Sequence, residues 1–213
     1  MFADDLALLA PSIVELQCMI NICCNELRSI DLVLNEKKSS CIRIGKRWHN
    51  ECSPLVTLNG NIEWASSVMY LGIKFVSENA LKYDWDKHTS RFYTSFNAIY
   101  SKLGRLNNQI VTMHLVSSIA LPSLLFPTEA VPQNTFIKCM EHPWSRAFMK
   151  VFNTFDHSIV NECQYNLGLP SVEQLVRRRK IKFINSMAAS QHWFLRLLHA
   201  LYAIKELNSA VLN

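Results

Sequence analysis

Positions 2–11 of the sequence read Phe2-Ala3-Asp4-Asp5-Leu6-Ala7-Leu8-Leu9-Ala10-Pro11. The apolar run from Leu6 to Ala10 follows two aspartates and precedes a proline, which predicts a short buried strand. Successive side chains of a strand point to opposite faces, so Asp4 and Asp5 can reach one ion only at a tight turn or strand end. An adjacent pair of aspartates is also typical of a solvated surface turn.

A helix is expected directly after this strand, because Ser12 and Glu15 form a capping box ahead of apolar residues spaced three and four apart. Two short β segments are expected at residues 32–34 and 41–44, with a basic turn at residues 35–38 between them. The beginning of the chain therefore predicts short β segments on either side of one helix.

Residues 55–64 predict a hairpin that turns at Asn59-Gly60. A two-residue loop would oppose Leu58 with a polar residue, whereas a three-residue loop would oppose it with Ile62. We prefer the second register because it pairs apolar with apolar side chains. One further strand is expected over residues 68–76.

From about residue 84 the pattern becomes helical. The first helix has an apolar side that includes Trp85, Phe92 and Phe96. Its cations fall within about 60° of one another on the opposite side, and they are Lys87, Arg91, Lys102 and Arg105. Such a stripe suits phosphate contact, although it is also compatible with a solvated face. Further helices are expected at residues 110–120, 135–152, 172–190 and 193–206.

Composition supports a folded chain, since 49% of the 213 residues are hydrophobic and 18% are charged. Charge is unevenly divided along it. Residues 1–81 carry 7 Lys and Arg against 9 Asp and Glu, whereas residues 82–213 carry 15 against 8. We therefore expect an α+β protein with two parts, 1–81 and 82–213, of which the basic second part suits an anionic partner such as nucleic acid.

The cysteines and the start of the sequence favour an intracellular protein, cytoplasmic or nuclear. The 7 cysteines include no Cys-x-x-Cys pair, and the first residues lack the basic and apolar regions of a secretory signal. The longest stretch without a charged residue, 107–128, contains two prolines and several polar residues. It predicts a buried helix ending near Pro122 rather than a membrane span.

Several segments resemble, in the same order, motifs of the reverse transcriptases of non-LTR (LINE-type) retrotransposons. Phe2-Ala3-Asp4-Asp5 resembles the aromatic-x-Asp-Asp motif, in which the first aspartate is a metal ligand. Leu34-Asn35-Glu36-Lys37-Lys38-Ser39 resembles the next motif, and Lys38 takes the place of a lysine proposed to assist the pyrophosphate. Tyr70-Leu71-Gly72 is similar to the segment that grips the primer. Residues 121–129 and 167–179 resemble the helical thumb and the region after it.

The resemblance implies that residues 1–81 are the C-terminal part of a palm, a partial β-sheet with a packed helix. Residues 82–213 would then form an all-helical thumb and connection. It also implies that Asp4 and Asp5 bind Mg²⁺ in a two-metal site and that the cations of the first long helix follow the backbone of an RNA template and a DNA primer.

The family's palm also carries a further catalytic aspartate and a glycine-containing nucleotide-binding motif before the Asp-Asp turn, and this sequence has no counterpart of either. Its 5 glycines form no phosphate-cradling loop. We therefore expect a C-terminal portion of a reverse transcriptase that is inactive alone and whose partner is the missing N-terminal part of the polymerase. The alternative is a non-enzymatic, helical nucleic-acid-binding protein derived from such an element.

Overall fold

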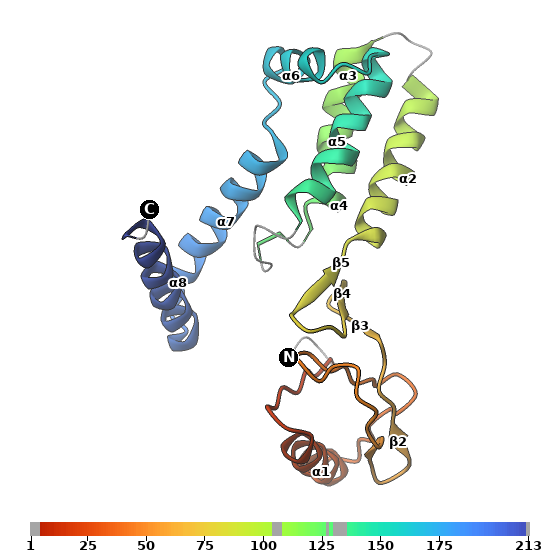
Figure 1. Ribbon diagram of the computed structural model, residues 1–213, viewed down its shortest axis with the longest axis vertical. Helices are drawn as coiled ribbons and strands as arrows, with labels where there is room; N and C mark the ends of the chain where they lie inside the picture. The colour runs from red at the N-terminus through yellow and green to blue at the C-terminus, as the bar shows by residue number, and fades with distance from the viewer. Residues whose placement is uncertain (1–4, 104–107, 127, 130–135, 212–213) are drawn as a thin grey trace. The chain divides into compact units, whose positions relative to one another are not determined.

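The computed structural model describes residues 5–103, 108–126, 128–129 and 136–211, with side chains as far as Tyr202. Helices and two small antiparallel sheets make up these residues, which confirms the expected α+β class. The chain divides into two compact units, Met1–Asp84 and Trp85–Asn213 (Figure 1). The sheets belong to the first unit, and all helices except the first belong to the second.

The helix α1 (Ile13–Ser29) begins where the sequence predicts, because the Ser12 side chain accepts a hydrogen bond from the backbone N–H of Glu15 at 3.2 Å. Its buried face contributes to a small core, and the fully buried members of that core are Ile20, Cys24, Leu55 and Ile62. The amide of Gln17 also bonds both backbone groups of Val56: its nitrogen donates to the carbonyl at 2.6 Å and its oxygen accepts from the N–H at 2.8 Å.

The strands β1 (Leu55–Val56) and β2 (Asn61–Ile62) confirm the expected hairpin but not its register. Leu55 pairs with Ile62, whereas we had expected Leu58 to oppose Ile62. Thr57 explains the difference: its N–H donates to the carbonyl of Gly60 at 2.8 Å, and its hydroxyl accepts from the N–H of Gly60 at 3.1 Å. The loop therefore closes at Thr57 and leaves Leu58 exposed.

A second sheet contains β3 (Ser67–Tyr70), β4 (Ile73–Val76) and β5 (Lys82–Asp84), paired in that order. The single strand expected over residues 68–76 is wrong, because the chain reverses at Leu71 and Gly72. The sequence analysis missed β5, a short polar strand. The ammonium of Lys74 on β4 contacts the carboxylate of its cross-strand neighbour Asp84 at 2.6 Å.

Three other expected strands are also wrong. Residues 6–10 and 32–34 lie in neither sheet, and of residues 41–44 only Cys41 forms a bridge, with Trp64. A strand needs a neighbour for its backbone N–H and C=O groups, and apolar composition does not supply one. The segment 6–10 instead leaves Leu9 88% exposed and packs only Leu8 against the core near α1.

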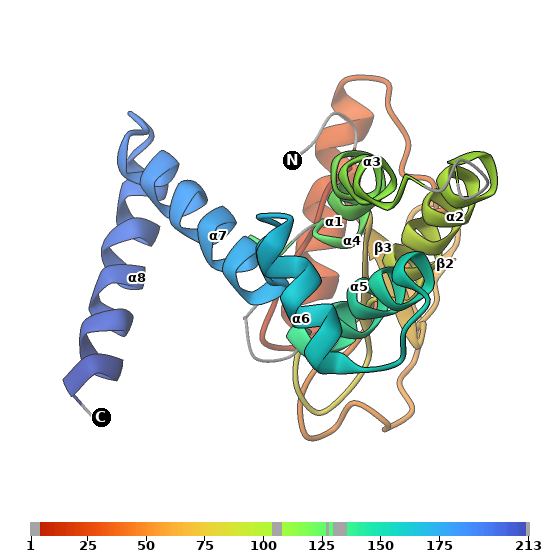
Figure 2. The same ribbon diagram turned by 90° about the horizontal axis from the view of Figure 1, so that it is seen from above.

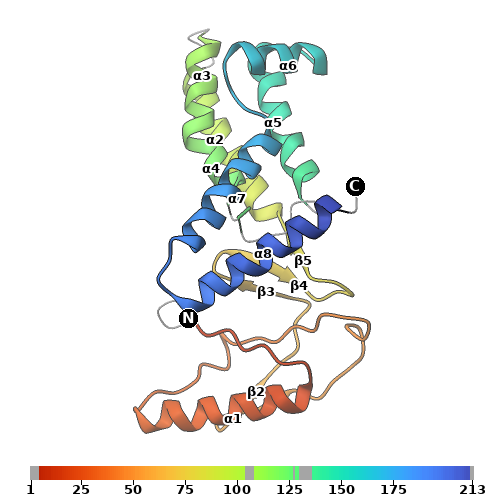
Figure 3. The same ribbon diagram turned by 90° about the vertical axis from the view of Figure 1, so that its left-hand side faces the viewer.

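The second unit consists of helices. They are α2 (Asp86–Leu103), α3 (Gln109–Leu115), η2 (Val116–Ala120), α4 (Leu121–Leu124), α5 (Ile137–Phe152), α6 (His157–Asn166), α7 (Val172–Ala188) and α8 (Trp193–Val211). The helices α2, α4 and α5 lie side by side, and α7 and α8 pack against each other beyond them (Figures 2 and 3). Among the described helices, none is both long and apolar enough to cross a membrane.

The expected helices agree with this arrangement except in three places, one of which is α8, because it continues to Val211 instead of ending at residue 206. The helix predicted over 110–120 starts at Gln109 and continues to Leu124 through the π-helical turn η2, in which the N–H of Leu121 donates to the carbonyl of Val116. Pro122 is tolerated because it lies in the first turn of α4. No sequence pattern predicted α6, which is short and only weakly amphipathic and is capped by Asp156.

Aromatic side chains form the core between α2 and α5. Phe92 on α2 and Trp144 on α5 are almost inaccessible to solvent, and their ring centroids lie 6.5 Å apart. Trp144 in turn meets Phe148 edge-on at 5.1 Å, and Phe92 lies 6.2 Å from Phe96. Large rings at these separations contribute most of the burial that joins two helices.

We expect Phe92→Ala to lower the free energy of unfolding by about 3–5 kcal/mol, because it removes a fully buried ring and leaves a cavity. Phe155→Ala is the matched control: the same substitution at an 85% exposed ring should change it by less than about 0.5 kcal/mol. Urea unfolding followed by circular dichroism at 222 nm measures both. Equal losses in the two variants would contradict the assignment of this core.

Candidate nucleic-acid interface

The expected Mg²⁺ site has little support among the described residues. Asp4 lies outside them, and Asp5 is exposed. In the part of the chain that the structure describes, no three His, Cys, Asp or Glu side chains come close enough to hold a metal ion. Because a two-metal site needs several converging carboxylates, these residues alone do not fit one, and we assign no step to a metal.

Lys38 lies in a turn that Asn35 organises. The side-chain oxygen of Asn35 accepts from the N–H of Lys38 at 3.1 Å, and its carbonyl accepts from the Ser39 hydroxyl at 2.8 Å. The expected turn at residues 35–38 is therefore present. The Lys38 side chain is exposed and has no salt-bridge partner among the described residues. Its ammonium is accessible to an anion.

Tyr70, Leu71 and Gly72 form the tip of the β3–β4 hairpin. Tyr70 pairs with Ile73, so Leu71 and Gly72 are the two loop residues, with φ angles of +48° and +83°. Two consecutive left-handed residues are typical of a type I′ turn, in which asparagine followed by glycine is preferred. Leucine costs energy at that position, and this one is 42% exposed. The motif thus places an apolar side chain on a strained, exposed tip.

The helix α2 presents its predicted cations to solvent. Lys87, Arg91 and Lys102 are exposed, while Arg105 lies outside the described residues. Burial of Phe92 and Phe96 on the opposite side fixes this orientation. Fifteen residues at 1.5 Å each separate the first and last of these three cations by about 22 Å along the helix axis.

The exposed side of α2 between these cations is lined by small side chains. Thr94, Ala98 and Ser101 are all exposed and lie between Arg91 and Lys102. Among the described residues, no salt bridge involves Lys87, Arg91 or Lys102. A phosphate backbone could therefore approach the helix closely and meet unpaired charges.

Lys150 on α5 is a further cation near α2, and no sequence pattern singled it out. Its ammonium lies 5.0 Å from the ring centroid of Tyr100 and 3.2 Å from the side-chain oxygen of Asn97. The hydroxyl of Tyr100 donates to the carbonyl of Lys150 at 3.5 Å. Through these contacts Lys150 stabilises the packing of α2 against α5.

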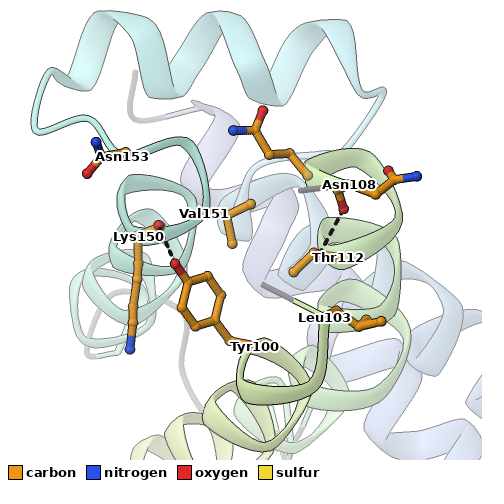
Figure 4. A pocket seen from close by; sticks show the side chains of 8 residues that line it. Tyr100, Leu103, Asn108, Thr112, Lys150, Val151 and Asn153 are labelled. Carbon is orange, nitrogen blue, oxygen red and sulfur yellow. Dashed lines mark hydrogen bonds between the residues drawn. The ribbon is translucent and has the colours of Figure 1, made fainter. Parts of the chain in front are cut away.

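A small polar cavity of about 180 Å³ lies beside this contact, and Figure 4 shows the side chains around it. The Thr112 hydroxyl donates to the carbonyl of Asn108 there at 2.9 Å, which ties the start of α3 together. Leu103, Lys150 and Asn153 are among the other residues that line it. The cavity is a shallow space between helix ends, and the described residues that line it include no acid.

Comparison with known proteins returns nothing: no family model, curated protein or solved structure matches this chain.

The strained turn at Leu71 generates a stability prediction. Leu71→Asn creates the Asn-Gly pair that a type I′ turn prefers, and we expect it to raise the free energy of unfolding by about 1 kcal/mol. Leu58→Asn is the control, since Leu58 is a similarly exposed hairpin residue without a positive φ, and it should have little effect. Urea titration monitored by tryptophan fluorescence measures both. No gain at Leu71 would mean that the turn is not strained.

Proposed function

We propose that the chain is a portion of an RNA-directed DNA polymerase of the non-LTR retrotransposon type and that it holds the template–primer duplex. The observation that carries the proposal is the exposed face of α2, where Lys87, Arg91 and Lys102 have no acidic partner among the described residues. An idle surface usually mixes both signs of charge. In this proposal residues 1–81 are the end of the palm and the helices are thumb and connection.

The charges of α2 act through phosphates and give affinity without sequence preference. If all three cations contact a duplex, the logarithm of the binding constant should fall with the logarithm of salt concentration with a slope of about −2.7. The small side chains between the cations allow the sugar-phosphate backbone to lie against the helix.

The other motifs of the first unit would lie near the reacting ends of the nucleic acid. The exposed Leu71 tip of the β3–β4 hairpin would contact the primer end, and the Lys38 ammonium would lie near the pyrophosphate. Asp4 and Asp5 would supply two carboxylates of a Mg²⁺ site that needs further ligands.

Charge reversal tests the α2 face. We expect Arg91→Glu combined with Lys102→Glu to weaken binding of a 20-base-pair RNA–DNA duplex at least about tenfold at 0.1 M KCl, because two attractions become repulsions. Fluorescence anisotropy with a labelled duplex measures the dissociation constant. The salt slope should become shallower in the same variant.

The matched control is Lys46→Glu combined with Arg47→Glu, which makes the same change of charge at two exposed residues of the first unit. We expect its loss of affinity to be no more than about threefold, which is the effect of net charge alone. Equal losses in the two double variants would show that the α2 cations are only a solvated face.

A primer-extension assay tests whether the chain alone can synthesise DNA. We expect the chain alone to add no nucleotides to an RNA-templated DNA primer in Mg²⁺, since its described residues gather no metal-holding group. Synthesis that disappears in Asp4→Ala would contradict this and show a complete active site. A Mg²⁺-dependent gain in duplex binding that Asp5→Ala abolishes would favour the polymerase over the non-enzymatic alternative.

A further inference from the structure

A groove of about 630 Å³ lies between α5, α6 and the N-terminal end of α7. It is separate from the α2 cations, because none of them lines it. Lys138, His142 and Arg146 recur at every fourth position of α5 along one wall, and His157 at the start of α6 faces the same space. The buried ring of Trp144 also lines it. The volume is in the range that holds a small-molecule-sized group.

The groove is predominantly cationic. Lys138 and Arg146 are exposed cations, and two histidines add further N–H donors. Glu141 is the one acid among the described residues that line it. The N-terminal end of α7 at Ser171 adds the partial positive charge of a helix start. These groups together favour an anionic ligand.

Phe155 is the unusual member of the lining. It is 85% exposed, although large aromatic side chains are normally at least half buried. It lies in the connection between α5 and α6, where solvent surrounds almost the whole ring. An aromatic face beside cations is the arrangement on which unpaired bases stack.

Hydrogen bonds on both sides hold the Phe155 backbone in place. Asn153 ends α5 in a left-handed conformation, and the N–H of Thr154 donates to the carbonyl of Met149 at 3.0 Å. On the other side Asp156 caps α6: its carboxylate accepts from the N–H of Ser158 at 2.8 Å, and the hydrogen bonds from Ser158 lower the pKa of Asp156. The caps of α5 and α6 therefore hold the backbone on both sides of Phe155, and its ring is exposed between them.

We propose that this groove binds a single strand of nucleic acid, with one base stacked on Phe155 and phosphates along the same strand against Arg146 and Lys138. A duplex keeps its bases stacked inside, so it cannot use Phe155 in this way. An acidic peptide would satisfy the cations but has no planar base for the exposed ring. The combination of ring and cations therefore favours a single strand.

The test measures the binding of 5′-fluorescein-labelled (dT)₁₀ and (U)₁₀ to the full chain by anisotropy at 0.1 M KCl. We expect Phe155→Ala to weaken binding about tenfold and Phe155→Trp to restore it to within about twofold, because any large aromatic face can stack on a base. Lys138→Glu combined with Arg146→Glu should also weaken it at least tenfold. With two phosphate contacts, the salt slope of the unaltered chain should be about −1.4.

Tyr165→Ala is the matched control, because Tyr165 is 86% exposed on the neighbouring helix α6 but does not line the groove. It should leave binding of (dT)₁₀ unchanged. Glu141→Gln should strengthen that binding, since it removes the acid from the lining. Phe155→Ala should leave duplex binding unchanged. The double variant Arg91→Glu with Lys102→Glu should weaken duplex binding and leave (dT)₁₀ binding unchanged.

Three results would overturn the proposal. The first is no binding of either oligonucleotide at 100 μM chain. The second is an equal affinity of the unaltered chain and Phe155→Ala for (dT)₁₀. The third is a labelled (Glu)₁₀ peptide that binds as tightly as (dT)₁₀ and competes with it, which would assign the groove to acidic peptides. Failure of the α2 variants to affect duplex binding would overturn the proposed function alone and leave this site intact.

Discussion

The contact between Phe92 and Trp144 determines which surfaces the second unit offers. The rotation of a helix about its axis decides which side chains it exposes, and burial of Phe92 against α5 fixes this rotation for α2. Lys87 and Arg91 then face solvent because they lie on the side opposite the buried rings. The same contact fixes α5, so that Lys138 and Arg146 line the groove toward α6. One aromatic contact thus orients both proposed nucleic-acid surfaces.

Local hydrogen-bonding patterns made the helices predictable. Ser12 and Ser171 both cap the helices that follow them, and Ser171 with Gln174 forms a complete capping box. These signals lie within four residues of each other, so no tertiary information is needed to recognise them. The strands were predicted poorly because pairing depends on distant partners. The apolar run 6–10 was expected as a strand from composition alone, yet no described sheet includes it.

The two hairpins show why register is harder to predict than the presence of a turn. In the first hairpin, the hydrogen bonds between Thr57 and Gly60 set the register. The pairing of apolar side chains, which predicted Leu58 opposite Ile62, does not set it. In the second, Leu71 adopts a left-handed conformation that leucine rarely takes, so the sequence indicated a continuous strand. The cations of α2 were predictable from helical periodicity. The groove was not, because its lining comes from three helices and the segment joining two of them.

The amide of Gln17 has a consequence for how this chain behaves at high concentration. A two-stranded sheet exposes backbone N–H and C=O groups along its outer edges, and such edges recruit strands from other molecules. Gln17 bonds both the N–H and the C=O of Val56, the pair of groups that an incoming strand would use. A glutamine on a helix therefore protects the edge of β1 against self-association. In most proteins a lysine, a proline or a bulge on the edge strand itself has this effect.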